Sequence, residues 1–167
     1  MITATENLRR EIVALLPRLR RFGRTLTRDR DDADDLVQVA VERALLRADQ
    51  WQPGTRLDSW IFRIMQNAWI DELRTRSRHA ATFVDADDIA DPGVHPIDAR
   101  NEALAVEQAL DRLNDDHRAV VALVLIEGLA YKEAAQVLDI PVGTLTSRLA
   151  RARELLQQLL GNAKEGR

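Results

Sequence analysis

Residues 131–153 read YKEAAQVLDIPVGTLTSRLARAR, and this stretch decides the fold of the C-terminal part of the chain. Residues 131–138 have the apolar spacing of one short helix. Pro141 lacks a backbone N–H, so it is suited to begin a helix and not to continue one. A second helix is therefore predicted from Val142. Two helices joined so tightly indicate a helix-turn-helix, the motif that places its second helix in the major groove of DNA.

The second of these helices has two distinct faces, because successive residues are turned by about 100° around a helix. The apolar face comprises Leu145, Leu149, Ala152 and Leu156. The polar face comprises Thr144, Ser147, Arg148 and Arg151. An amphipathic helix with a solvated arginine face would show the same periodicity. The hydroxyls and arginines gather toward the N-terminal half, which is the half that reaches base edges in this motif, and this favours DNA binding.

Helical periodicity extends through most of the remaining sequence. Upstream of the helix-turn-helix, helices are predicted over residues 98–113 and 116–127, with Gly128 as a terminator. Near the N-terminus, apolar residues recur every three or four positions, but Pro17 interrupts them, so we expect a short helix followed by a second one from Pro17. A further helix is predicted around the apolar stripe of residues 33–45 and ends before Trp51. Another is predicted from Asp58 or Ser59, with apolar residues along one side as far as Leu73 and the basic stretch 74–78 at its far end. The fold class is therefore all-α.

Charge is distributed unevenly along the chain. The net charge of −3 divides into +3 for residues 1–79, −8 for residues 80–116 and +2 for residues 117–167. Residues 80–97 combine acids with proline and glycine and have little periodicity, which is typical of a flexible linker. We therefore expect two small helical domains, residues 1–79 and 98–167, joined by an acidic linker over residues 80–97.

Composition excludes several classes of function. The chain has no cysteine, which rules out a disulfide framework, a thiolate nucleophile and cysteine-bound zinc. Its three histidines, His79, His95 and His117, lack the spacing that would place two imidazoles on one helix face, so no metal is expected. No catalytic set and no phosphate-binding glycine loop is present, so we expect no enzyme activity, no cofactor and no small-molecule substrate. Without a membrane span or signal peptide, the expected location is cytoplasmic.

Two blocks of sequence resemble the extracytoplasmic function (ECF) sigma factors, group IV of the sigma-70 family. Residues 128–153 resemble the fourth domain of that family, whose pattern is close to G-hydrophobic-S-Y-x-E-I-A, then P-x-G-T-V-x-S-R-x-x-R-A-R. Residues 32–38, DADDLVQ, resemble the D-A-E-D-L-V-Q signature of the second domain. Residues 60–67, WIFRIMQN, resemble its W-L-x-R-I-A-x-N signature. The chain is thus identified as similar to a family that directs RNA polymerase to promoters.

This resemblance implies three sets of contact residues. The helix over residues 34–47 would bind core RNA polymerase through Asp35, Leu36, Gln38, Glu42 and Arg43. The loop of residues 51–59 and the helix after it would open the −10 element and hold a flipped base, with contacts from Asn67, Asp71, Arg74, Arg76 and Arg78. The −35 element would be read as duplex by Thr144, Ser147, Arg148 and Arg151. In the family a cognate anti-sigma factor often covers both domains, so such a protein is a further expected partner.

Alternatives remain for some of these residues. The acids of residues 31–35 would also complement the dipole of the helix that they begin, without contacting a partner. Trp51, Trp60 and Trp69 are expected in the core more than as stacking platforms. Ala130 stands where the family usually has a capping Ser or Thr, and Thr146 stands at a position that is often basic in relatives.

Two other classes of protein also fit parts of the sequence. A sigma-factor mimic that sequesters an anti-sigma factor would lack the basic DNA-reading positions that are present here. A stand-alone helix-turn-helix regulator would not need residues 32–38 or 60–67.

Overall fold

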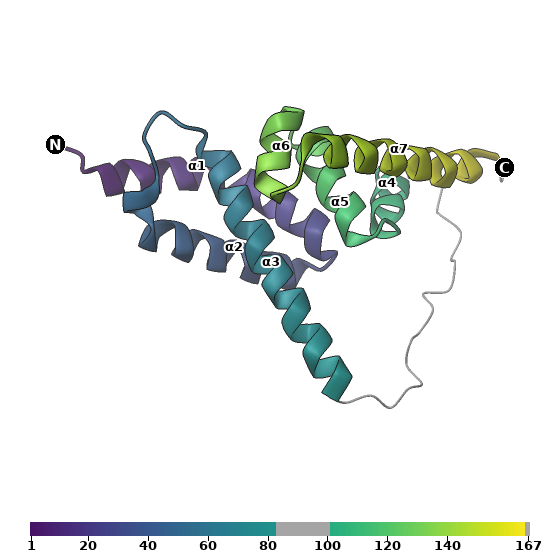
Figure 1. Cartoon of the computed structure of the whole chain (residues 1–167), viewed down its shortest axis with the longest axis horizontal. Helices are drawn as coiled ribbons and strands as arrows, with labels where there is room; N and C mark the ends of the chain where they lie inside the picture. Colours follow the sequence, from purple (N-terminus) through teal and green to yellow (C-terminus); the bar gives the residue numbers. More distant parts are fainter. Residues whose placement is uncertain (83–100, 166–167) are drawn as a thin grey trace.

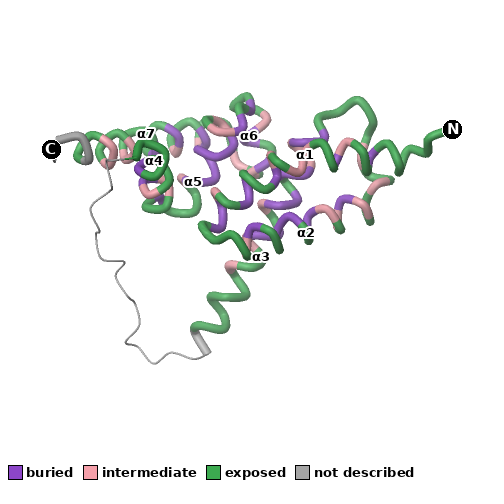
Figure 2. The backbone as a smooth tube through the Cα atoms, turned by 180° about the vertical axis from the view of Figure 1, so that it is seen from behind, coloured by how far each residue is buried: buried purple, intermediate pink, exposed green. Residues whose placement is uncertain are grey.

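A computed structural model describes residues 1–82 and 101–165, and within these ranges the chain is helical with no strand. The N-terminal domain contains α1 (Ala4–Thr27), α2 (Arg30–Leu46), the short 3₁₀ helix η1 (Ala48–Gln50) and α3 (Leu57–Thr82). The first two helices begin at side-chain caps, since Thr3 and Asp29 each accept a hydrogen bond from a first-turn N–H. The C-terminal part of α3 projects away from the other helices and is exposed (Figures 1 and 2).

The C-terminal domain contains α4 (Glu102–Asp111), α5 (Asp115–Val121), a π-helical segment η2 (Ala122–Ile126), α6 (Tyr131–Leu138) and α7 (Val142–Glu165). Gly128 has a φ of 71°, a conformation that glycine adopts without steric cost, and it separates η2 from α6. Asp139, with a φ of 53°, makes the tight turn from α6 to α7. The predicted helix-turn-helix is confirmed, and α7 begins at Val142 as predicted and continues to Glu165.

The two domains pack against each other instead of lying apart. Helix α1 contacts α5 and η2, and α3 contacts α6 (Figure 1). One apolar cluster runs through both domains and includes Phe22 and Phe62, whose ring centroids are 4.7 Å apart, together with Leu123 and Leu149. Trp69 belongs to this cluster and is a core residue as expected, whereas Trp51 and Trp60 are half-buried and pack against its edge. The described domains therefore share one hydrophobic core.

The expected break at Pro17 is wrong, because α1 is continuous from Ala4 to Thr27. Proline removes one hydrogen bond, to the carbonyl four residues earlier, at a cost of about 3 kcal/mol. Here that earlier residue is Val13, and both Val13 and Pro17 lie on the exposed side of the helix. Ile12 and Leu19 on the opposite side are buried, and their burial on both sides of the proline keeps the two halves in one helix.

The predicted domain boundary at residue 79 falls inside α3, which continues to Thr82. Residues 83–97 of the expected acidic linker lie outside the described residues, as do residues 98–100 of the helix predicted over 98–113. The described part of that helix is α4, Glu102–Asp111, which begins at the cap residue Asn101. The helix predicted over 116–127 divides into α5 and η2.

Ala130 is the N-cap residue of α6 and makes no side-chain capping hydrogen bond. The variant Ala130→Ser should raise the free energy of unfolding by about 1 kcal/mol, because a serine hydroxyl at this position accepts a bond from a first-turn N–H. Urea unfolding followed by circular dichroism measures the change. Ala130→Val, which adds no acceptor, should bring no gain, and equal stabilisation by both variants would contradict the capping explanation.

Candidate polymerase and nucleic-acid interface

The recognition helix α7 separates its polar and apolar faces as the periodicity predicts. Leu145, Leu149 and Ala152 are fully buried, at 1% exposure or less. On the other side Ser147 and Arg151 are exposed, while Thr144 and Arg148 are half-buried. The hydroxyl of Ser147 donates to the carbonyl of Gly143 at 3.0 Å, so it is held close to the helix backbone.

The two arginines of this face already have acidic neighbours. The Arg148 guanidinium lies 3.7 Å from a carboxylate oxygen of Asp116 in α5, and Arg151 donates to Glu154 at 3.0 Å. Both are solvent-accessible ion pairs, which contribute at most about 1 kcal/mol and are easily exchanged for a phosphate or a base edge. These ion pairs therefore orient the two guanidinium groups and still leave them able to exchange their acidic neighbours for another partner.

The predicted polymerase-binding residues lie on α2, although not all of them face solvent. Asp35, Gln38 and Glu42 are exposed, and Gln38 donates to Glu42 at 3.4 Å. Arg43 is half-buried, whereas Leu36 is only 6% exposed and belongs to the core. Leu36 therefore supports the helix from below, and the accessible surface comes mainly from its polar neighbours.

The predicted −10 residues follow one another along the exposed part of α3. Asn67 and Asp71 are one helical turn apart and both are exposed. Further along, the predicted phosphate-binding arginines Arg74, Arg76 and Arg78 are exposed too. The three arginines belong to the C-terminal part of α3, where Arg76 still contacts Asp32 of α2, and the end of this helix projects from the other helices (Figure 1).

A groove between α2 and α3 brings the first two sets of residues together. It is lined from α2 by Asp32, Asp35 and Arg43 and from α3 by Asp71 and Arg76. The helix-turn-helix residues do not line this groove. Members of the predicted polymerase-binding set and of the predicted −10 set are thus neighbours, while the predicted −35 residues lie outside this groove.

Arg76 is held within this groove by several partners. It donates to both carboxylate oxygens of Asp32, at 3.0 and 2.8 Å, and to Glu72 at 2.9 Å, while its guanidinium lies over the Trp69 ring at 5.3 Å. The hydrogen bonds from Arg76 lower the pKa of Asp32 and outweigh the opposing effect of its burial. Arg76 therefore fastens α2 to α3, in addition to the DNA contact expected for it from sequence.

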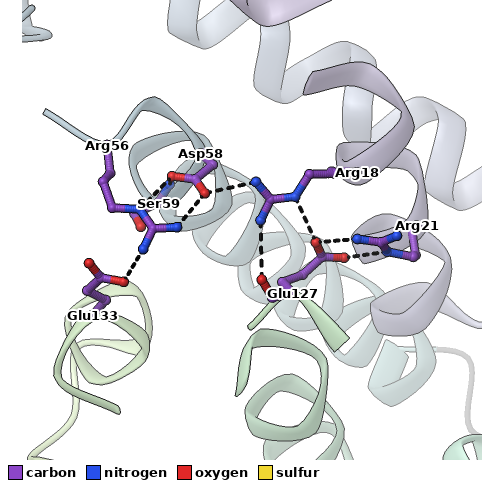
Figure 3. A network of polar contacts seen from close by, with 7 residues as sticks. All are labelled: Arg18, Arg21, Arg56, Asp58, Ser59, Glu127 and Glu133. Atoms are coloured by element: carbon purple, nitrogen blue, oxygen red, sulfur yellow. Dashed lines mark hydrogen bonds and ion pairs between the residues drawn. The ribbon is translucent and has the colours of Figure 1, made fainter. Parts of the chain in front are cut away.

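A second polar network joins the two domains (Figure 3). Glu127, which follows η2, accepts hydrogen bonds from Arg18 at 3.1 Å and from Arg21 at 2.8 Å, both residues of α1. Arg18 also donates to Asp58 at 3.0 Å, and Arg56 donates to Asp58 and to Glu133 of α6. The network therefore reaches from the loop before α3, through α1, to the C-terminal domain.

This network favours the ionised form of the Asp58 carboxyl group. Burial would raise the pKa of its carboxyl, but hydrogen bonds from Arg56, from the backbone N–H of Ser59 and from Arg18 together lower that pKa below its usual value. The helix begins at Leu57, so Asp58 and Ser59 lie inside its first turn and neither is the cap residue predicted for it. The Asp58 carboxylate accepts a hydrogen bond from the backbone N–H of Ser59 at 2.8 Å.

None of these interdomain contacts could be identified from the sequence. One weak signal was present: Glu127 ends a run of eight apolar residues, 119–126, and is the only charged residue between Arg118 and Lys132. A charge in that position needs a partner if the segment is buried. Its arginine partners lie more than 100 residues away in sequence, so no local pattern could supply them.

Within residues 1–82 and 101–165, no group of three or more His, Cys, Asp or Glu side chains is arranged to hold a metal ion. Among the helices of the same ranges, none is both long enough and apolar enough to cross a bilayer.

Comparison with known proteins matches both domains. Residues 12–79 match the family model of Sigma-70 region 2, and residues 103–156 match that of Sigma-70, region 4. The ECF RNA polymerase sigma factor EcfG of Rhodopseudomonas palustris (strain TIE-1) is 38% identical over 159 residues, which are 93% of this chain and 86% of that protein. SigM of Mycobacterium tuberculosis (strain H37Rv) is 35% identical, over 89% of this chain and 74% of that protein.

Solved structures of sigma factors are also similar to this chain. The sigma factor RpoE of Bartonella quintana, in complex with the anti-sigma factor NepR, is 31% identical with a TM-score of 0.79, covering 93% of this chain and 98% of that chain. CnrH in complex with the cytosolic domain of CnrY has a TM-score of 0.67 at 25% identity, covering 93% and 88%. Two sigma-70 regions in the correct order define the class of protein. The chain belongs to the ECF RNA polymerase sigma factors.

The lowered pKa of Asp58 predicts a dependence of stability on pH. A folded-state pKa below the unfolded value contributes stability above about pH 4, and this contribution is lost as the pH falls further. Asp58→Asn should therefore lower the free energy of unfolding by about 2 kcal/mol at pH 6, since it weakens charged hydrogen bonds. The difference in the free energy of unfolding between Asp58→Asn and the wild-type protein should become smaller toward pH 3.

Urea unfolding at pH 6, 5, 4 and 3 measures this profile. Asp49→Asn, which removes an exposed carboxylate of η1, is the matched control and should track the wild-type curve. A constant gap between Asp58→Asn and the wild-type protein at every pH would contradict the ionic contribution of Asp58.

Proposed function

We propose that this sigma factor binds core RNA polymerase in the cytoplasm and directs transcription initiation at promoters with its own −10 and −35 elements. The observation that carries the proposal is the pair of separate surfaces: the α2–α3 groove in the N-terminal domain and the polar face of α7 in the C-terminal domain. Similarity to ECF sigma factors over about nine-tenths of the chain supports the assignment of a role to each surface.

In this proposal α7 enters the major groove of the duplex at −35. Arg148 and Arg151 provide the guanidinium donors that pair with guanine edges or phosphates, and Thr144 and Ser147 provide hydroxyls at the N-terminal end of the helix. Leu145 and Leu149 anchor the helix in the domain core, so the polar face has a fixed orientation.

The exposed part of α3 and the loop of residues 51–59 serve the melted −10 element. Unstacking a base costs a few kcal/mol, which contacts to the flipped base and to phosphates must offset. Asn67 and Asp71 are the proposed readers of that base, and Arg74, Arg76 and Arg78 the proposed phosphate contacts. For Arg76 this requires the exchange of its ion pair with Asp32 for a phosphate.

The exposed side chains of α2 are the proposed contacts to core polymerase, namely Asp35, Gln38 and Glu42, with Arg43 at the border of the groove. Two of the similar structures contain an anti-sigma factor or the cytosolic domain of a partner protein. We therefore include an anti-sigma factor among the partners of this chain.

Transcription with purified core polymerase over a library of promoters tests the function. The chain should produce run-off transcripts that core polymerase alone does not. Tight binding to an anti-sigma factor without any such transcript would point to a sigma-factor mimic. Repression of transcription without binding to core polymerase would point to a stand-alone helix-turn-helix regulator.

Arg148→Glu should abolish −35-dependent initiation, because it places a negative charge against the phosphates and base acceptors of the groove. Binding to core polymerase should remain within twofold of the wild-type value, as judged by a pull-down titration. Lys132→Glu, an equivalent charge reversal on the exposed side of α6, is the control. Unchanged initiation by Arg148→Glu would contradict the placement of the recognition helix.

Glu42→Arg should weaken binding to core polymerase about tenfold and leave binding to a −35 duplex unchanged. Glu42 lies on the exposed face of α2, so its replacement should not disturb the core. Fluorescence anisotropy with labelled core polymerase and with labelled duplex measures the two affinities. Asp49→Arg, just beyond α2, provides the matched charge reversal. An equal loss in both variants would argue against a specific polymerase contact at Glu42.

A further inference from the structure

Glu127 is a buried carboxylate that connects the two domains. Its side chain is fully buried at 0% exposure, whereas those of Arg18 and Arg21 are 32% and 53% exposed. Arg21 donates to both carboxylate oxygens at 2.8 Å, and Arg18 donates to the carboxylate and, at 3.4 Å, to the backbone carbonyl of Glu127. We call the packing of the two domains against each other the closed arrangement. In it, the buried carboxylate of Glu127 keeps its charged partners only while α1 lies against η2.

Further polar contacts cross the same interface. Glu133 of α6 accepts a hydrogen bond from Arg56 at 2.5 Å, and the carbonyl of Leu113, after α4, accepts one from Arg28 at 2.7 Å. Arg18 links Glu127 to Asp58, and Asp58 in turn binds Arg56, so the charges form one connected chain (Figure 3). Several hydrogen bonds therefore hold the interface together, and their polar groups could form hydrogen bonds with water instead.

The interface also contains a pocket lined by polar side chains from both domains. The side chains of Gln66 and Trp69 in α3 line a pocket together with Asp115 and Asp116 of α5. The Oε1 atom of Gln66 and the Nε1 atom of Trp69 are buried without a hydrogen-bond partner.

Reading both promoter elements requires a longer reach than the closed chain has. Elements centred at −10 and −35 are about 25 base pairs apart, which is about 85 Å along the duplex at 3.4 Å per step. A compact chain of this length has a radius of gyration of about 15 Å. The two domains must therefore separate before α3 and α7 can reach their elements together.

From these observations we propose that Glu127 and its arginine partners form a latch that holds the free sigma factor closed, and that promoter recognition requires its release. This inference rests on the proposed function, because it assigns a regulatory role to the distance between the two DNA-reading surfaces. On opening, Glu127, Arg18 and Arg21 all become hydrated, so none is left as an unpaired buried charge. The latch is therefore reversible.

Distance measurement in the free protein tests the latch directly. Because the chain has no cysteine, Gln52→Cys and Gln136→Cys introduce two labelling sites, one in the loop before α3 and one on the exposed side of α6. Spin labels at these sites report the separation of the domains by double electron–electron resonance. The wild-type background should give one short, narrow distance, and Glu127→Gln should increase the population at long distances about tenfold.

The matched control is Glu11→Gln, which makes the same chemical change in α1, where Glu11 accepts a hydrogen bond only from Asn7 within the same helix. It should leave the distance distribution unchanged. Because Glu127 is buried, Glu133→Gln serves as a second variant at a more accessible contact and should shift the distribution in the same direction but less. The double exchange Arg21→Glu with Glu127→Arg should restore part of the short distance.

Transcription provides the second readout. Glu127→Gln should lower the sigma concentration for half-maximal initiation by up to tenfold, because a larger fraction of the chain is competent to bind. A wild-type protein that is already open, or a Glu127→Gln distribution identical to that of Glu11→Gln, would overturn the latch. If no variant initiates transcription while the distances still shift, the latch stands and the proposed function fails.

Discussion

The packing of α1, both within its own domain and against the C-terminal domain, is the interaction on which the rest of the structure depends. One side of this helix packs on α2 and α3, and it also contacts α5 and η2 of the C-terminal domain. Phe22 of α1 meets Phe62 of α3, and the Arg18 guanidinium lies over the same Phe62 ring at 5.4 Å. The apolar core and the interdomain network therefore meet at one helix, so a change in α1 affects both the stability of each domain and their association.

The fold could be predicted from sequence wherever local periodicity decided it. The turn between α6 and α7 was located correctly, because Pro141 and the apolar stripe of α7 depend only on nearby residues. The break expected at Pro17 was wrong, since apolar packing on both sides of the proline outweighs one missing hydrogen bond. Leu36 was assigned to a polymerase contact by resemblance, and its 6% exposure places it in the core instead.

The association of the domains could not be predicted, because it depends on pairs that are distant in sequence. Glu127 meets Arg18 and Arg21, and Glu133 meets Arg56, through contacts that no spacing rule indicates. The arginines assigned to DNA were likewise expected in isolation, yet Arg76 and Arg148 have carboxylate neighbours in Asp32 and Asp116. At these proposed contacts nucleic acid would compete with acids of the protein itself, which would weaken indiscriminate attachment to phosphate backbones.

The shared hydrophobic core has a consequence for how the protein behaves in solution. Leu123 and Leu129 of the C-terminal domain are buried in the same cluster as Phe22 of α1, so separated domains would present apolar surface to water. Exposed apolar patches promote self-association unless another protein covers them. Packing of the two domains against each other therefore keeps this apolar surface covered. Any lasting population of separated domains would be expected to aggregate at high concentration unless polymerase or another partner is present in comparable amounts.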